Sequence, residues 1–243
     1  MYKKAANIIK NSKNLIAFTG AGISVESGIP TFRGKNGIWS KYDPKILDID
    51  YFLNYPKESW EKIKEIFYDY MEDKKPNYAH YFLSKLEQEN ILKALITQNI
   101  DNLHQEAGSK NVIEFHGTAK KILCLKCFTK YPIEKIDLNT LPPLCPKCNG
   151  LLKPDFVFFK EPIPENALKK SLDLAKKVDV ILVIGTTGEI MPASQIPIIA
   201  KQNKAIIIEI NPEESAYTDT ITDIHLKEKA SIATKKIKEH SNF

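Results

Sequence analysis

Short apolar runs recur along the chain, separated by stretches in which apolar residues return every third or fourth position. The runs are nearly continuous, and they occupy residues 15–18, 92–97, 180–185 and 205–210. Strands that are covered by helices on both faces show such continuous runs, whereas half-exposed strands alternate between apolar and polar residues. We therefore expect four buried strands of a parallel sheet.

Helical spacing marks the stretches that lie between or before these runs, at residues 2–13, 77–89, 164–177 and 192–203. The lysine-rich segment 227–238 is also typical of an amphipathic helix, with its lysines on a solvated face; a nucleic-acid-binding tail is the alternative. Alternation of strand and helix predicts an α/β fold with a doubly wound, Rossmann-like sheet.

Two segments interrupt this alternation. Residues 34–76 carry aromatic residues at helix-like spacing and are expected to form a helical insertion, whereas residues 119–153 hold all the cysteines. Both segments leave the sheet and return to it, so together they are expected to form a smaller lobe. The large, sheet-containing part of a single domain over 1–243 would then comprise 1–33, 77–118 and 154–243.

The composition is that of an ordinary globular protein, with 43% hydrophobic and 27% charged residues in 243 and a mild net charge of +5. No apolar run approaches the roughly 18–20 residues that cross a bilayer. The first residues lack the apolar stretch of a signal peptide, because polar residues interrupt it. We expect a cytoplasmic protein without a membrane partner.

Four cysteines fall in two pairs, each pair separated by two residues, with seventeen residues between the pairs. Two such turns can point four thiolates at one ion, and this spacing is typical of zinc ribbons. Two disulfides or unrelated buried thiols are the alternatives, but disulfides are rare in the cytosol. The expected site is one structural zinc, without an open coordination position, bound by Cys124, Cys127, Cys145 and Cys148.

A glycine turn follows the first apolar run, at Gly20, Ala21 and Gly22, although the next glycine, Gly28, comes later than in the usual dinucleotide-binding pattern. Glycines let a diphosphate approach the backbone closely, but an ordinary turn is the alternative. Polar residues follow other strands too, at 98–101, 185–187 and 211. Because ligands of doubly wound sheets bind beyond the carboxyl ends of the strands, these termini predict a binding crevice there.

The motifs taken together resemble the sirtuin family over nearly the whole chain. They are Gly-Ala-Gly-Ile-Ser at 20–24, Ser-Gly-Ile-Pro-Thr-Phe-Arg at 27–33, Thr-Gln-Asn-Ile-Asp at 97–101 with Leu-His at 103–104, and His-Gly at 116–117. The cysteine pairs follow in the order of that family. The resemblance implies an NAD-dependent protein-lysine deacylase, which converts acyl-lysine proteins or peptides and NAD to free lysine, nicotinamide and an O-acyl-ADP-ribose.

The resemblance also implies roles for single residues. His116 would be the general base for a ribose hydroxyl, as suits an imidazole, with Asn99 on the ribose or a water and Asp101 at the nicotinamide pocket. His80, His225 and His240 are expected to be structural, and His104 to pack or to orient its loop. The NAD-binding residues would be Gly20, Ala21, Gly22, Ile23, Ser24, Pro30, Thr31, Phe32, Arg33, Gln98, Asn99, Ile100, Asp101, Gly185, Thr186, Thr187 and Asn211.

The acyl group would meet Tyr68 and Met71, where sirtuins that remove succinyl and malonyl groups have a Tyr-x-x-Arg pair. Without that arginine, an acidic acyl group would lose about 2–5 kcal/mol, so acetyl or longer hydrocarbon acyl groups are expected. Gly188 resembles the Tyr-x-x-Arg branch and conflicts with this prediction, and a pure packing role for Tyr68 and Met71 is the alternative.

A substrate-binding strand of the family resembles residues 154–161, with Phe156, Val157, Phe158 and Phe159 as the expected substrate contacts. Two positions depart from the family pattern: Phe156 stands where a valine is usual, and Lys160 where a glycine is usual. Because this strand is thought to pair with the peptide through its backbone, the departures bear directly on peptide binding.

Three other functions compete with the deacylase. The same NAD site would serve protein ADP-ribosyl transfer, a zinc ribbon alone would suit a nucleic-acid binder, and a chain without catalysis would be an NAD sensor. The mixed charge of the cysteine segment argues against nucleic acid as a partner. Asn99, Asp101 and His116 together argue for catalysis, and the sequence leaves the oligomeric state open.

Overall fold

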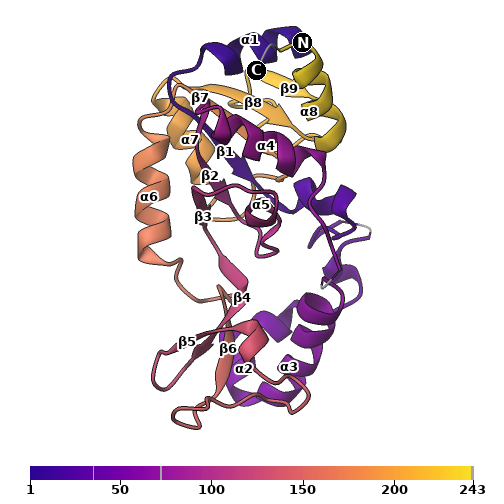
Figure 1. The fold of residues 1–243 in the computed structure, drawn as a ribbon, viewed down its shortest axis with the longest axis vertical. Helices are drawn as coiled ribbons and strands as arrows, with labels where there is room; N and C mark the ends of the chain where they lie inside the picture. The colour runs from indigo at the N-terminus through magenta and orange to yellow at the C-terminus, as the bar shows by residue number, and fades with distance from the viewer. Residues whose placement is uncertain (35, 72, 242–243) are drawn as a thin grey trace.

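The computed structural model describes residues 1–34, 36–71 and 73–241. The molecule is elongated, with a large lobe built on a sheet and a smaller lobe at the opposite end (Figure 1). Both chain termini lie on the large lobe, and the small lobe is made from two internal segments. Among the described residues, no helix is long and apolar enough to cross a membrane.

The large lobe contains a parallel sheet whose strand order, within the described residues, is β3-β2-β1-β7-β8-β9. The chain winds from β1 toward β3 and then from β7 toward β9, so the topological switch point lies between β1 and β7. The strands are β1 (Leu15–Thr19), β2 (Leu92–Thr97), β3 (Val112–Glu114), β7 (Val180–Ile184), β8 (Ile206–Ile210) and β9 (Ile224–Leu226). The doubly wound class and the four expected strands are confirmed, and the short strands β3 and β9 add to them.

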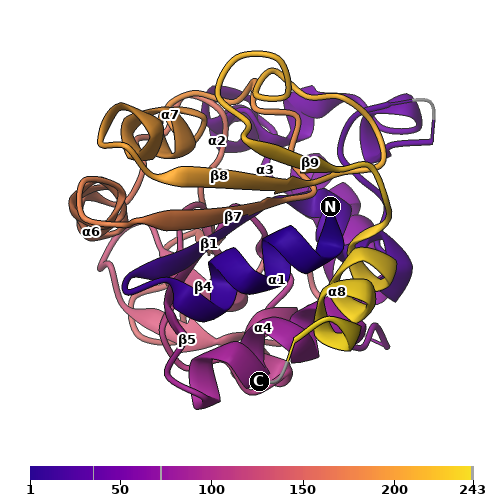
Figure 2. The ribbon, with the colours of Figure 1, turned by 90° about the horizontal axis from the view of Figure 1, so that it is seen from above.

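Helices cover both faces of this sheet, on one side α1 (Tyr2–Asn11), α4 (Tyr78–Gln88) and α8 (Ala230–Glu239), and on the other α6 (Glu165–Ala175) and α7 (Gln195–Gln202) (Figure 2). Successive residues of β1 enter opposite layers: Leu15 and Ala17 face the first set of helices, and Ile16 and Phe18 face the second.

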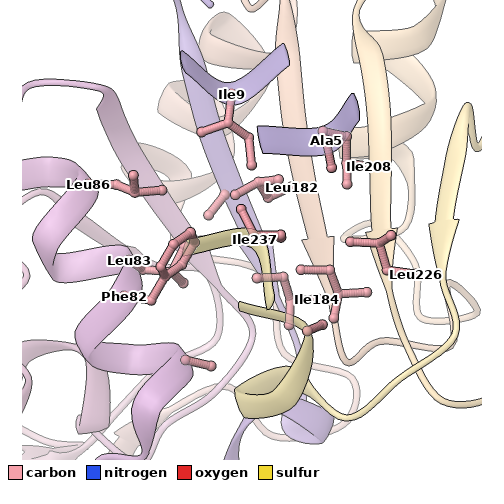
Figure 3. Close-up of a cluster of buried hydrophobic side chains, with 14 of the residues drawn as sticks. Ala5, Ile9, Phe82, Leu83, Leu86, Leu182, Ile184, Ile208, Leu226 and Ile237 are labelled. Carbon is pink, nitrogen blue, oxygen red and sulfur yellow. The ribbon is translucent and has the colours of Figure 1, made fainter. Parts of the chain in front are cut away.

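The first layer packs side chains from helices and strands that are distant in sequence (Figure 3). Ile9 of α1, Leu83 of α4, Leu182 of β7 and Ile237 of α8 are all fully buried in it. Burial of each such side chain contributes about 1.5–3 kcal/mol to the stability of the fold. The helices are thereby held on the faces of the sheet, and the strand ends remain as the place for a site.

The small lobe combines helices with a separate antiparallel sheet of order β5-β4-β6 within the described residues. The segment expected to be helical is so, with η2 (Ile38–Ser40), η3 (Pro44–Leu47), α2 (Ile49–Asn54), α3 (Pro56–Ile63) and the π-helical turn η4 (Lys64–Asp69). The cysteine segment forms β4 (Gly117–Cys124), β5 (Lys130–Pro132), the 3₁₀ turn η5 (Ile133–Lys135) and β6 (Leu152–Phe156). Strands β4 and β6 extend past both ends of the predicted module 119–153.

One apolar core joins the two parts of the small lobe. Trp60 of α3 is fully buried, and its indole Nε1 donates a hydrogen bond of 2.8 Å to the carbonyl of Leu152 in β6. Phe52 of α2 meets Phe158 edge to face, with ring centroids 5.2 Å apart. The two inserts therefore form a single packed lobe, as the sequence suggested.

Candidate active site

The glycine turn after β1 packs directly on the turn after β7, at the switch point. Gly22 N–H donates to Gly185 O at 2.9 Å, and a Cβ on Gly22 would lie 2.6 Å from Gly185 Cα. Gly185 itself has φ +64, a left-handed conformation that glycine adopts without strain. Beyond Gly20 the chain continues as the 3₁₀ helix η1 (Ala21–Ser27) in place of an ordinary α-helix. Only glycine fits this contact, so the backbones of the two turns touch directly.

Polar side chains from neighbouring strands converge on Thr186. Gln98, which follows β2, donates to the Thr186 hydroxyl at 3.1 Å, and Asn211, which follows β8, donates to the Thr186 carbonyl at 3.1 Å. His225 of β9 donates from Nε2 to the Asn211 carbonyl at 3.0 Å. The structure thus brings the predicted strand-end residues together at one edge of the sheet.

A buried polar chain lies between this edge and helix α4. Asn99 Nδ2 donates to Gly20 O at 3.2 Å and to Ser24 Oγ at 3.3 Å, and Ser24 Oγ donates to Asp101 Oδ2 at 2.7 Å. Burial raises the pKa of Asp101, while the Ser24 hydroxyl and the Leu103 amide stabilise its ionised form. These contacts hold three predicted site residues in fixed orientations.

His80 belongs to the same series of hydrogen-bonded polar side chains. Its position in the sequence suggested a structural role. Its Nδ1 accepts from the Asn77 amide at 3.2 Å, so Nε2 carries the proton and faces Ser24 Oγ at 3.5 Å. Burial lowers the pKa of His80 to about 4, which keeps the ring neutral. No sequence signal distinguished this histidine, because it lies within the apolar pattern of α4.

His104, in the short helix α5 (Leu103–Glu106), packs against His80 with ring centroids 4.8 Å apart. Its Nε2 lies 3.0 Å from the Thr19 hydroxyl, which bonds Thr97 at 2.9 Å. Burial holds the pKa of His104 well below its usual range. This arrangement agrees with the expected packing role of His104, which directly follows the turn after β2.

His116 directly precedes strand β4 and is held against the turn that follows β2. Its Nδ1 is 3.1 Å from the carbonyl of Gln98, and since a carbonyl only accepts, Nδ1 is the protonated nitrogen. The neutral ring then has its lone pair on Nε2, as a general base requires. Burial lowers the pKa of His116 below 6.5, partly opposed by the Gln98 carbonyl.

The loop that follows η1 connects the glycine turn with the small lobe. Phe32 packs on Trp39 and Phe67, with ring centroids 5.6 Å and 6.2 Å away. Arg33 points toward the loop after β7, where its Nη1 lies 3.9 Å from Glu189 Oε2 at an exposed position. Pro30 and Thr31 precede these two residues, so the predicted residues 30–33 lie between η1 and the helical insertion.

The predicted acyl-contact residues lie in the core of the small lobe. Tyr68 stacks on Trp60 at 6.2 Å, and its buried hydroxyl has no hydrogen-bond partner among the residues that the structure describes. Met71 is partly buried against the same cluster. Phe156 and Phe158 are buried with their rings 5.3 Å apart, whereas Phe159 is 45% exposed. Val157 donates its amide to the His116 carbonyl at 2.8 Å.

The cysteines form a compact cluster at the far side of the small lobe. Their four sulfur atoms all lie within 4.8 Å of one another, with Cys124–Cys148 at 3.5 Å and Cys127–Cys145 at 3.7 Å. None of them is in a disulfide. Zinc–sulfur bonds of about 2.3 Å in a tetrahedron separate the sulfurs by about 3.8 Å, so the donor set and its spacing fit zinc.

A doubly wound sheet with polar side chains gathered at its switch point, joined to a lobe with four clustered thiols, defines an α/β protein of the dinucleotide-binding class. Within that class, the Sir2 family model matches residues 20–192, and the chain belongs to the Sir2 family. The resemblance to sirtuins is thereby confirmed.

Curated relatives agree over almost their full lengths. An NAD-dependent protein deacylase of Pyrococcus abyssi is 47% identical over 95% of this chain and 94% of the relative. An NAD-dependent protein deacetylase of Caldivirga maquilingensis is 45% identical over 89% of this chain and 85% of the relative.

Solved structures agree as well. A complex of Sir2 with a p53 peptide and NAD+ has a TM-score of 0.91 at 35% identity, covering 98% of both chains. A mutant Sir2 homologue in complex with ADP-ribose has a TM-score of 0.93 at 39% identity, covering 99% of this chain and 96% of the other.

Proposed function

We propose that this protein is an NAD-dependent protein-lysine deacylase. The observation that carries the proposal is the hydrogen bonding of His116, whose Nδ1 is held by Gln98 O, while the Ser24 hydroxyl bonds both Asn99 and Asp101. The free Nε2 would then be the base for a dinucleotide bound at the switch point, where doubly wound proteins bind dinucleotides. Relatives named deacylases and deacetylases support the assignment.

NAD would lie across the carboxyl ends of β1, β7 and β8. The backbone of Gly20 to Ser24 would hold the diphosphate, because glycines let an anion approach the backbone closely. The close contact of Gly22 with Gly185 would fix this turn beside the turn after β7. Thr186 and Asn211 would hold the adenosine half, with Gly185 and Thr187 beside them. The remaining NAD contacts proposed are Pro30, Thr31, Phe32, Arg33, Gln98, Asn99, Ile100 and Asp101.

In the reaction, the acyl oxygen of the substrate lysine replaces nicotinamide on the ribose, and nicotinamide leaves. His116 Nε2 then takes the proton of a ribose hydroxyl, whose oxygen forms a bond to the acyl carbon. Asn99 orients the ribose or a water molecule. With one water consumed, lysine and O-acyl-ADP-ribose are the remaining products. Binding both reactants in line would supply much of the rate by orientation.

The substrate would be an acyl-lysine peptide or protein lying along residues 156–159. Tyr68 and Met71 offer an acyl group aromatic and thioether surface, together with the neighbouring Phe67 and Phe156. The surroundings therefore favour acetyl or hydrocarbon acyl groups over acidic ones. A cytoplasmic location is proposed on the chemistry of the four thiols, since a reducing compartment keeps them available to a metal.

One zinc would be held by Cys124, Cys127, Cys145 and Cys148. Four thiolates close its coordination sphere, so the ion would supply structure and no Lewis-acid chemistry. Gly150 supports this role, because a Cβ there would lie 3.1 Å from Cys124 Sγ and 2.6 Å from the Cβ of Lys126. The turn at Gly150 is thus packed so closely on the sulfur atoms that it has no room for a side chain.

The test is a panel of acyl-lysine peptides incubated with NAD, using the natural chain and His116→Ala. Nicotinamide release that requires an acyl-lysine, and that falls by a factor of about 10²–10⁴ in the variant, supports the proposal. Release that is independent of the acyl group and leaves ADP-ribose on protein would assign the chain to ADP-ribosyl transfer. No release with any peptide would refute the deacylase.

A further inference from the structure

Lys160 has a backbone conformation that is unusual for a lysine. Its φ is +72, in the left-handed region, where a Cβ normally crowds the following carbonyl. The residue lies directly after the segment proposed to carry the peptide substrate. A side chain in this position must be stabilised by contacts that glycine would not make.

Those contacts are two ion pairs to the helical insertion. Lys160 Nζ lies 2.9 Å from Asp48 Oδ2 and 2.7 Å from Asp50 Oδ2. The Asp48 carboxylate also accepts hydrogen bonds from the amides of Asp50 and Tyr51, at the start of α2. Bonding to Lys160 lowers the pKa of Asp48, and both aspartates raise the pKa of Lys160. Asp48 and Lys160 therefore stay ionised near neutral pH.

The backbone just before Lys160 pairs with the same region. Phe159 N–H donates to Leu47 O at 2.7 Å, and Ile49 N–H donates to Phe159 O at 3.3 Å. Two residues earlier, Val157 is hydrogen-bonded to the carbonyl of His116. Residues 157–160, here called the strap, thus connect His116 with the helical insertion. Lys160 is the last residue of the strap and joins it to the insertion through its ion pairs.

We propose that Lys160 is a positioning residue that fixes this strap for the peptide substrate. The inference rests on the proposed deacylase function, since it gives the strap a ligand. Lys160 touches neither acyl group nor NAD in this arrangement; it acts through Phe159 and Asp48. Because the lysine side chain is 60% exposed and that of Asp50 67%, dissolved salt screens the contact. Peptide affinity should therefore depend on ionic strength, and NAD affinity should not.

The first experiment measures KM for an acetyl-lysine peptide and KM for NAD at about 20 mM and about 500 mM salt. The chains are the natural protein, Lys160→Gln and Lys160→Arg. In Lys160→Gln the peptide KM rises about two- to fivefold at low salt, as expected for loss of exposed ion pairs. Its NAD KM stays the same, and its peptide KM no longer rises with salt. Lys160→Arg retains the natural values.

A matched control is Lys85→Gln, which removes a lysine in a 2.7 Å pair with Glu89 on α4, away from the strap. It should leave both KM values unchanged. Equal changes of the peptide and NAD KM in Lys160→Gln, or no change in either, would overturn the proposal. So would the same salt dependence in Lys160→Gln as in the natural protein.

A second measurement separates this proposal from the deacylase assignment. Amide hydrogen exchange at Ile49 and Phe159 reports the strap without any substrate. Faster exchange in Lys160→Gln, with the natural exchange rates restored in Lys160→Arg, would show that Lys160 fixes the strap, even if the protein shows no turnover. Unchanged exchange in Lys160→Gln would refute it, even for a chain with full deacylase activity.

Discussion

Acid should destabilise this protein through His80, which the fold keeps neutral. In the unfolded chain this ring binds a proton near pH 6.5, but burial holds its pKa at about 4 in the folded state. Between these pH values the unfolded state binds more protons, so the free energy of unfolding falls as the pH falls. The contribution is complete above pH 6.5 and is lost progressively toward pH 4.

The pKa difference sets the magnitude. Each pKa unit corresponds to about 1.4 kcal/mol, so His80 would account for about 2 kcal/mol lost at pH 5 and about 3 kcal/mol once both states are protonated. His104, whose pKa burial also lowers, acts in the same direction. An ordinary domain has only about 5–15 kcal/mol of stability, so the loss is easily measured.

The assay is urea unfolding followed by circular dichroism at pH 7, 6 and 5. The variant is His80→Gln, which keeps an acceptor for the Asn77 amide but cannot titrate. It should lose about 2 kcal/mol less than the natural chain between pH 7 and pH 5. Replacing the exposed His240 by Gln should preserve the natural pH dependence. Parallel curves for the natural chain and His80→Gln would show that burial does not hold this ring neutral.

Three further perturbations test other parts of the structure. Gly22→Ala would put a Cβ 2.6 Å from Gly185 Cα. This overpacking should lower the free energy of unfolding in urea by about 1–3 kcal/mol and raise the NAD KM in a steady-state assay. An unchanged NAD KM would contradict a role of this turn in binding NAD. Zinc removal by a chelator should unfold the small lobe and abolish activity, with metal content, circular dichroism and turnover measured together; an active, metal-free protein would contradict the structural role. Met71→Arg should increase succinyl-lysine turnover relative to acetyl-lysine by about tenfold or more, whereas natural preference for succinyl-lysine would refute the argument from Met71.

The parts of the fold predicted from sequence are those with a strong local pattern. Strands β1, β2, β7 and β8 are continuous apolar runs, and the helices between them have clear periodicity. Strands β3 and β9 have three residues each, too few for any such pattern. The small antiparallel sheet was not predicted, because the cysteine turns and non-local pairing define it more than any run of apolar residues.

The same distinction applies to the site. Gln98, Thr186 and Asn211 were predicted to converge because each follows a strand of a parallel sheet, and they do so. The place of His80 depends on a distant contact, in which Asn77 at the start of α4 donates to Ile23 O at 2.7 Å. That Lys160 stands where the family usually has glycine could be read from the sequence. The ion pairs that hold this lysine could not, because Asp48 and Asp50 are more than a hundred residues away in the chain.

The hydrogen bond from Trp60 to Leu152 has a consequence for how the chain folds during synthesis. The aromatic core around Trp60 is completed by strand β6, which is made more than eighty residues later. At about 5–20 residues per second, the helical insertion waits several seconds beside the ribosome with its apolar face uncovered. The first half of the molecule is therefore the part most exposed to aggregation, and metal supplied early would not relieve it, because Cys145 and Cys148 emerge as late as β6 does.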